Sequence, residues 1–135
     1  MESKKKIGVI LVISITIVIF GSYLFFFNKQ REDLVTLGPE NNGQEVIIEK
    51  GGEVIIELAE NPSTGYAWEF ATISEFAKLL ENRYIQPEKQ IPGRGGTRKI
   101  RLKISRNGTF SAKYIGPMGK VIENRFSLTF KVGQE

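Results

Sequence analysis

The sequence predicts an all-β protein, an immunoglobulin-like β-sandwich of about seven strands, preceded by one transmembrane helix. Three observations support this prediction. Residues 7–27 form an uncharged apolar run, the later apolar residues alternate with polar ones as in half-buried strands, and clusters of Gly, Pro and Asn separate the alternating segments. The chain has 135 residues, which leaves room for one domain beside the helix, because single domains usually contain about 100–150 residues.

The apolar run is long enough to cross a membrane. No charged residue lies between Ile7 and Phe27, and a helix of about 20 residues spans the hydrocarbon core. The alternative is a cleaved signal peptide, whose apolar region usually covers only about 7–15 residues and ends in small residues. This run instead ends in consecutive phenylalanines at positions 25–27, so we expect a retained signal anchor.

The charges on either side of the run predict its orientation. Lysines at positions 4–6 precede it, whereas Lys29 and Arg31 follow it, and cytoplasmic flanks carry the excess of Lys and Arg. We therefore expect residues 1–6 to be a cytoplasmic stub of a single-pass cell-membrane protein whose C-terminal domain is extracytoplasmic. Gly8 and Gly21 are too far apart to form a helix-dimer motif, so the chain is expected to be a monomer.

The rest of the chain divides into a linker and a domain. Residues 28–40 are mostly polar and contain Gly38-Pro39, which predicts a linker. Residues 41–135 are expected to form the sandwich domain. Its first two strands are predicted within residues 44–59, where β-branched residues flank Gly51-Gly52.

The middle of the domain has a less regular pattern. After a dense turn signal at residues 61–65, the segment from Tyr66 to Phe70 alternates aromatic residues with others, as a half-buried strand does. Residues 73–80 are predicted to form one or two helical turns with Ser74 as the N-cap. A short strand is expected to follow at Tyr84-Ile85.

The last third of the chain contains the clearest strand patterns. The segment from Thr97 to Ser105 alternates so that one face is apolar: Ile100, Leu102 and Ile104. Asn107-Gly108 is the strongest short hairpin signal in the chain and predicts a turn into a strand at residues 109–115. The Asn-Gly-Thr sequence also matches a glycosylation site, but the Asn-Gly pair favours the hairpin. A closing strand is predicted at residues 126–132.

Cationic residues dominate residues 94–131. Such a surface can bind nucleic acid or anionic lipid, or its strand faces can pair with carboxylates across the sheet. The second interpretation is favoured, because a half-buried strand is expected to have one charged face; the candidate carboxylates are Glu45, Glu49, Glu53 and Glu57. We therefore expect no nucleic-acid partner.

The composition disfavours catalysis. The chain contains no His and no Cys, which removes the commonest general base, the thiolate nucleophile and the usual zinc ligands. No carboxylates are grouped on the predicted loops. We expect no catalytic residue, no metal and no cofactor, and a function based on binding.

Three loops are richer in Gly and Pro than their connections require. They are Asn61 to Gly65, Gly93 to Gly96 and Gly116 to Gly119. In a seven-stranded sandwich, the connections after the second, fourth and sixth strands emerge at one end, as antibody binding loops do. The three loops are therefore predicted to form one binding surface.

These loops resemble those of the chagasin-like inhibitors of papain-type cysteine peptidases. Asn61-Pro62-Ser63-Thr64-Gly65-Tyr66, followed by Trp68, matches the family's Asn-Pro-Thr-Thr-Gly-Tyr loop with Ser in place of one Thr. Gly93-Arg94-Gly95-Gly96 matches a Gly-x-Gly-Gly loop. Gly116-Pro117-Met118 lies where the family has Arg-Pro-Trp or Arg-Pro-Phe, and keeps only the Pro.

The resemblance implies a membrane-anchored protein inhibitor whose partner is a papain-like cysteine peptidase. The first loop would enter the active-site cleft while the other two contact the cleft walls. The implied contact residues are Asn61, Pro62, Ser63, Thr64, Gly65, Tyr66, Gly93, Arg94, Gly95, Gly96, Gly116, Pro117 and Met118. The alternative is an extracytoplasmic protein-binding module on the same scaffold with a different ligand, since a fold alone does not determine a function.

Overall fold

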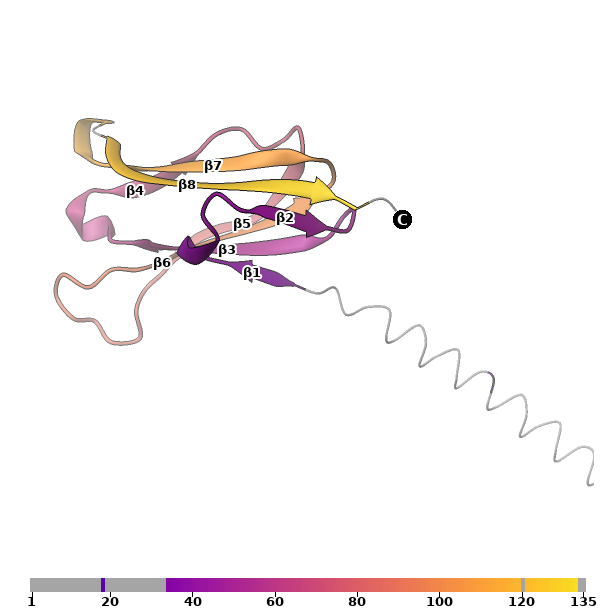
Figure 1. The fold of residues 1–135 in the computed structure, drawn as a ribbon. Coiled ribbons are helices and arrows are strands. Elements are labelled where there is room, and N and C mark those ends of the chain that lie inside the picture. Colours follow the sequence, from indigo (N-terminus) through magenta and orange to yellow (C-terminus); the bar gives the residue numbers. More distant parts are fainter. Residues whose placement is uncertain (1–17, 19–33, 120, 134–135) are drawn as a thin grey trace, which may run out of the picture. The chain divides into compact units, whose positions relative to one another are not determined.

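The computed structural model describes residues 18, 34–119 and 121–133, and β-strands account for most of them (Figure 1). The strands are β1 (Val35–Leu37), β2 (Glu45–Ile48), β3 (Glu53–Glu60), β4 (Ala67–Phe70), β5 (Ala77–Ile85), β6 (Gly96–Ile104), β7 (Gly108–Ile115) and β8 (Val121–Val132). Three short 3-10 turns interrupt them: η1 (Pro39–Asn41), η2 (Pro62–Thr64) and η3 (Pro117–Gly119). The all-β prediction is confirmed.

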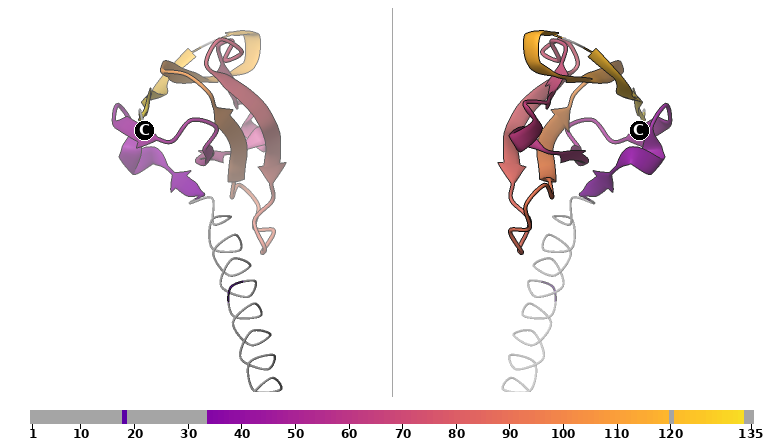
Figure 2. Two further views of the ribbon diagram at one scale, coloured as in Figure 1. Left: turned by 90° about the vertical axis from the view of Figure 1, so that its right-hand side faces the viewer. Right: turned by 90° about the vertical axis from the view of Figure 1, so that its left-hand side faces the viewer.

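The strands form two four-stranded sheets, with the orders β1-β3-β6-β5 and β2-β8-β7-β4. β1 pairs with β3 and β2 with β8 in parallel, whereas the other neighbours are antiparallel. Figure 2 shows the two sheets as separate layers. Both sheets are needed for the core, because each has one apolar face to bury.

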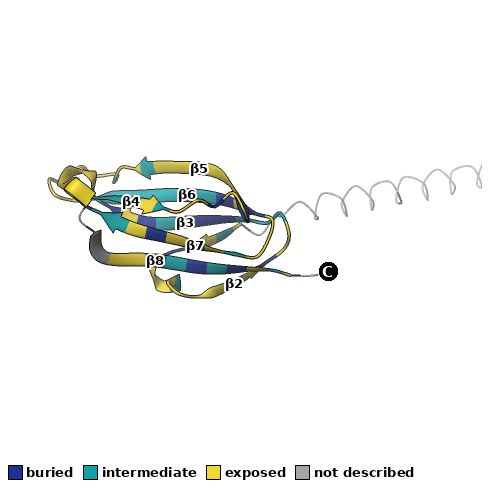
Figure 3. Cartoon of the chain, turned by 90° about the horizontal axis from the view of Figure 1, so that it is seen from above, coloured by how far each residue is buried: buried dark blue, intermediate teal, exposed yellow. Residues whose placement is uncertain are grey.

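The core lies between the sheets and follows the alternation of β3, β6, β7 and β8 (Figure 3). Its largest fully buried side chains are Phe110, Phe130, Ile56, Leu58, Ile100, Leu102, Ile104, Leu128 and Val54. Phenylalanine rings pack within it, with centroids 5.3 Å apart for Phe70 and Phe110. All of these residues belong to a compact unit, residues 33–135.

The described residues form eight strands, where the sequence predicted about seven, and the additional strand is β1. β1 lies within residues 28–40, where the sequence predicted a linker, and Val35 pairs with Val54 of β3. A three-residue segment has too little alternation to identify a strand. Pairing with the longer strand β3 gives it strand geometry.

The predicted helix at residues 73–80 is wrong. A single turn remains, in which the N–H groups of Phe76 and Ala77 donate to the Ile73 carbonyl over 3.1 and 2.9 Å. β5 then begins at Ala77 and pairs along its length with β6. Long-range pairing outweighs a weak local helical preference, as is common for sheet residues.

The predicted hairpin at Asn107-Gly108 is also wrong, because this pair connects β6 in one sheet to β7 in the other. The Asn107 Oδ1 accepts a hydrogen bond of 2.7 Å from the Val132 N–H. A Cβ on Gly108 would lie 2.3 Å from Cγ of Phe76. The Asn-Gly pair therefore lies where the chain passes from one sheet to the other, and the glycine allows the backbone to pack closely against Phe76.

Pairing of charges across the sheet is found for part of the predicted set. The Nε of Arg101 donates to Glu53 over 2.7 Å, and Glu57 lies opposite Lys99 in the register of β3 and β6. Glu45 belongs to β2, in the other sheet.

The predicted anchor at residues 7–27 lies outside the described residues except for Val18. Within residues 18, 34–119 and 121–133, none of the helices has the length and apolar character needed to span a bilayer.

Candidate functional site

The three predicted loops lie together at one end of the sandwich, which we call the loop end (Figure 1). The first loop is residues 61–66 after β3, the second is residues 86–95 after β5, and the third is residues 116–119 after β7. The Asn61 Nδ2 donates to the Gly93 carbonyl over 3.0 Å, which joins the first loop to the second. Gly65 lies against Pro117 of the third loop, since a Cβ on Gly65 would be 2.8 Å from the proline Cγ.

The apex of the first loop is held by its own hydrogen bonds. The Thr64 hydroxyl donates to the Asn61 carbonyl and the Ser63 hydroxyl to the Asn61 Oδ1, both over 2.6 Å. The Gly65 N–H donates to the Pro62 carbonyl over 3.0 Å, and Gly65 has φ 76°. Glycine is suited to this left-handed conformation. Residues 62–65 are exposed, so the apex is both ordered and accessible.

Asn61 connects the first loop to β7 and to the second loop. Its N–H donates to the Tyr114 hydroxyl over 3.0 Å, and Tyr114 lies on β7. Its side chain accepts from Ser63 and donates to Gly93. One asparagine therefore holds the first loop against both the second loop and the opposite sheet.

The end of the second loop and the start of β6 pack closely against neighbouring strands at two glycines. A Cβ on Gly95 would lie 2.5 Å from the Glu60 carbonyl oxygen, and one on Gly96 would lie 2.1 Å from that of Ile85. Gly96 is the first residue of β6, not part of the loop. Exposed Arg94 donates its backbone N–H to Ile91 over 3.0 Å.

A groove of about 330 Å³ separates the first and second loops. It is lined by Asn61, Pro62, Ser63, Tyr84, Gln86, Pro87, Gln90, Ile91, Gly93 and Arg94. Ile91 is 51% exposed, so an apolar side chain is presented to solvent beside the apex.

The third loop is seated on an aromatic ring. Gly116 is buried, and a Cβ there would lie 1.9 Å from Cε1 of Tyr66. The backbone can follow the ring only because position 116 has no side chain. Two residues later, Met118 has φ 60° and is 93% exposed. This conformation is unfavourable for a residue with a Cβ.

An aromatic group, formed by Tyr66, Trp68 and Tyr114, contacts the first and third loops. The rings of Tyr66 and Tyr114 are stacked with centroids 5.7 Å apart, and Trp68 lies 5.1 Å from Tyr114. The Trp68 Nε1 donates to the Ala59 carbonyl over 2.8 Å. Tyr66 therefore supports the loops by direct contact with Gly116. Trp68 supports them from its position on β4, through its contact with Tyr114.

A buried ion pair lies at the end of β3, next to the first residue of the first loop. Glu60 is 2% exposed, and its carboxylate accepts from Nη2 and Nε of Arg98 over 2.5 and 3.1 Å. The same carboxylate accepts from the Trp68 N–H over 3.0 Å. These bonds connect β3, β6 of its own sheet and β4 of the other sheet, immediately before Asn61.

Sequence reasoning identified the three loops but missed the residues that hold them. Glu60, Arg98, Tyr114 and Ile91 were not singled out as parts of the site. A signal existed for the ion pair: continuing the apolar alternation of residues 54, 56 and 58 puts Glu60 on the buried face. The alternation of β6 puts Arg98 on that face as well.

The domain is similar in sequence to known proteins. Residues 47–132 match the family model described as Chagasin family peptidase inhibitor I42. Chagasin from Trypanosoma cruzi is 32% identical over 74 residues, which cover 51% of this chain and 67% of chagasin.

Two solved structures share the fold. The crystal structure of the cysteine protease inhibitor EhICP2 from Entamoeba histolytica is similar with a TM-score of 0.60 and 24% identity, over 74% of this chain and 95% of that chain. The solution structure of amebosin has a TM-score of 0.59 and 26% identity, over 74% of this chain and 98% of that chain. Both relatives consist almost entirely of this domain. On the family match, supported by the chagasin relative, this chain belongs to the chagasin family of peptidase inhibitors and is not an enzyme.

Proposed function

We propose that the domain inhibits papain-like cysteine peptidases by inserting the first loop into the active-site cleft, with the second and third loops against the cleft walls. The observation that carries this proposal is the exposed apex at residues 62–65, which is held by hydrogen bonds to Asn61. Its sequence is the part of the chain that most resembles the family's inhibitory loop.

The geometry suits inhibition because the apex is ordered before binding. A loop that is already fixed loses little conformational entropy when it binds, so more of its contact energy appears as affinity. Pro62 restricts the backbone further. The Asn61 side chain ties the apex to the second loop, so the loops are expected to enter a cleft as one rigid body.

The sequence of the third loop supports the alternative function, a protein-binding module with a different ligand. Gly116-Pro117-Met118 lacks the Arg and the aromatic residue that the resemblance leads us to expect at this place. A different protein ligand on the same loop end would explain this change. Met118 can also replace an aromatic contact, since its thioether side chain is apolar and adapts to irregular surfaces.

We also propose that residues 7–27 anchor the domain in the cell membrane with the inhibitor domain outside the cytoplasm. The uncharged length of this run and the preceding lysines support the proposal.

Papain titration with a fragment of residues 33–135 tests the inhibitor proposal. We expect stoichiometric loss of activity, and we expect a Gly65→Trp fragment to inhibit at least about 100-fold more weakly, because binding should lose about 3 kcal/mol when a large side chain strains the apex. Gly133→Ala is the control, since its nearest neighbour would be 4.0 Å away. A fragment that leaves papain fully active at micromolar concentration, while folded by circular dichroism, would favour the alternative ligand.

Met118→Gly separates stability from binding at the third loop. Removing the Cβ from the left-handed conformation should raise the free energy of unfolding by about 1 kcal/mol. The same change removes an exposed apolar side chain, so peptidase inhibition should weaken by about tenfold or less. Urea unfolding and inhibition titration of one preparation measure both effects. Tighter inhibition by the glycine variant would contradict a contact role for Met118.

A further inference from the structure

We propose that the end of the sandwich opposite the loops binds anionic phospholipid headgroups through a basic patch, defined as Lys50, Lys78, Lys103 and Arg106. This base end is where β3, β5 and β7 begin and where β2, β6 and β8 end. The proposal goes beyond peptidase inhibition and uses none of the loop residues.

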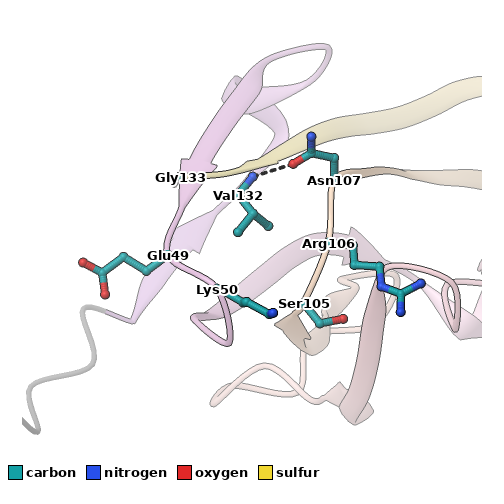
Figure 4. Close-up of a pocket in the computed structure, with 7 residues that line it drawn as sticks. All are labelled: Glu49, Lys50, Ser105, Arg106, Asn107, Val132 and Gly133. Atoms are coloured by element: carbon teal, nitrogen blue, oxygen red, sulfur yellow. Dashed lines mark hydrogen bonds between the residues drawn. The ribbon is translucent and has the colours of Figure 1, made fainter. Parts of the chain in front are cut away.

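The four cations lie close together although they come from separate segments. Lys50 and Arg106 line one groove of about 820 Å³ with Ser105, Asn107 and Val132 (Figure 4). A Cβ on Gly51 would lie 3.6 Å from Cε of Lys103, so Lys103 passes beside the turn that carries Lys50. Lys78 on β5 is the register partner of Lys103 on β6. All four residues are exposed.

This arrangement is unfavourable for the isolated domain. Like charges directly opposite each other on neighbouring strands repel, as Lys78 and Lys103 do here. Of the residues that the structure describes, those in ion pairs are Glu53, Glu60, Glu81 and their arginine partners. None of the four patch cations is among them.

Nearby carboxylates only partly offset the patch. Glu49 lines the groove, but Figure 4 shows its carboxylate directed away from Lys50. Glu75 lies in the exposed turn before β5, and Glu53 is already paired with Arg101. Among residues 34–119 and 121–133, the four cations therefore outnumber the unpaired carboxylates that we find at this end, and a surface of negative charge would relieve their repulsion.

The path of the chain indicates a membrane as the source of that charge. β1 begins at Val35, whose partner Val54 lies at the start of β3, so the chain joins the domain at the base end. Residues 28–34 can span at most about 25 Å. The base end is thus within reach of the membrane that the proposed anchor crosses. A tether of this length raises the effective concentration of headgroups near the patch.

Vesicle sedimentation of the fragment of residues 33–135 tests this proposal without the anchor. Residues 33–135 form one compact unit, and EhICP2 and amebosin consist almost entirely of the same domain, so we expect the fragment to fold without residues 1–32. At low salt and millimolar lipid, the fragment should sediment with phosphatidylcholine vesicles containing about 30% phosphatidylglycerol and not with pure phosphatidylcholine. Near-physiological salt should weaken this binding, because the Debye length falls to about 8 Å.

The decisive comparison uses two double variants of equal net charge. Lys78→Glu/Lys103→Glu should bind anionic vesicles at least about 20-fold more weakly, on the basis of about fivefold per basic residue removed. Lys89→Glu/Lys113→Glu changes the same number of charges away from the base end and should weaken binding by only a few-fold. Equal losses in both variants, or equal binding to neutral vesicles, would overturn the proposal. Papain inhibition by the Lys78/Lys103 variant should be unchanged, so this test and the inhibitor test fail independently.

Discussion

Replacing Glu60 by Ala should lower the free energy of unfolding by about 3–5 kcal/mol, because it leaves the charge of a buried ion pair without a partner. Glu60 is 2% exposed, and the Arg98 side chain is 22% exposed. The substitution also removes the acceptor of the Trp68 N–H. Urea unfolding of the fragment of residues 33–135, followed by the fluorescence of its single tryptophan, measures the loss.

Two further variants test whether the large loss of stability comes from burial of the Glu60–Arg98 pair or from the loss of any ion pair. Glu53→Ala breaks the Arg101 pair, whose arginine side chain is 40% exposed, and should cost about 1 kcal/mol or less. Glu60→Met/Arg98→Met removes both buried charges and should recover most of the lost stability, since apolar residues of similar size often replace a buried pair without net cost. Equal losses in Glu53→Ala and Glu60→Ala would contradict this account.

Gly116→Ala is expected to weaken peptidase inhibition by about 10- to 100-fold, on the basis of the inhibitor function proposed above. The new Cβ would lie 1.9 Å from the Tyr66 ring, so the ring or the third loop must move. Overpacking of this kind costs about 1–3 kcal/mol, and each 1.4 kcal/mol corresponds to about tenfold in affinity. Because Tyr66 also stacks on Tyr114, the displacement should affect the whole loop end.

A double-mutant cycle with Tyr66→Ala tests this mechanism. If the clash with the ring is responsible, Gly116→Ala should cost much less stability in the Tyr66→Ala background than in the unmodified domain. Inhibition titrations and urea unfolding of all four proteins give the two coupling energies. Equal costs in both backgrounds would show that the Tyr66 ring is not the obstacle.

The parts of the fold that follow strict alternation were predicted correctly. Ile100, Leu102 and Ile104 are all fully buried on one face of β6, as their spacing predicted. The segment from Tyr66 to Phe70 was also correctly predicted to contain a strand, observed as β4. Alternation succeeds because successive side chains on a strand point to opposite faces.

The errors arose where a local signal had to compete with long-range pairing. Residues 73–80 have a possible helix cap, yet β5 begins within this segment at Ala77, and residues 77–79 pair with β6. Asn107-Gly108 is a strong hairpin signal, yet the Asn107 side chain bonds to Val132 on the last strand. The local sequence indicates which turn conformations a segment can adopt. It does not indicate which strands pair with each other on either side of the turn.

The sequence by itself determined the all-β class, the identity of the three exposed loops and the lack of His and Cys chemistry. Only the tertiary structure decided which sheet each strand joins, that Asn61 bonds to Tyr114 and Gly93, and that Gly116 lies against Tyr66. The physical reason is that alternation specifies the buried face of a strand, whereas its partners are selected by packing of two sheets around a shared core. The residues that hold the loops are distant in sequence and meet only once that packing is complete.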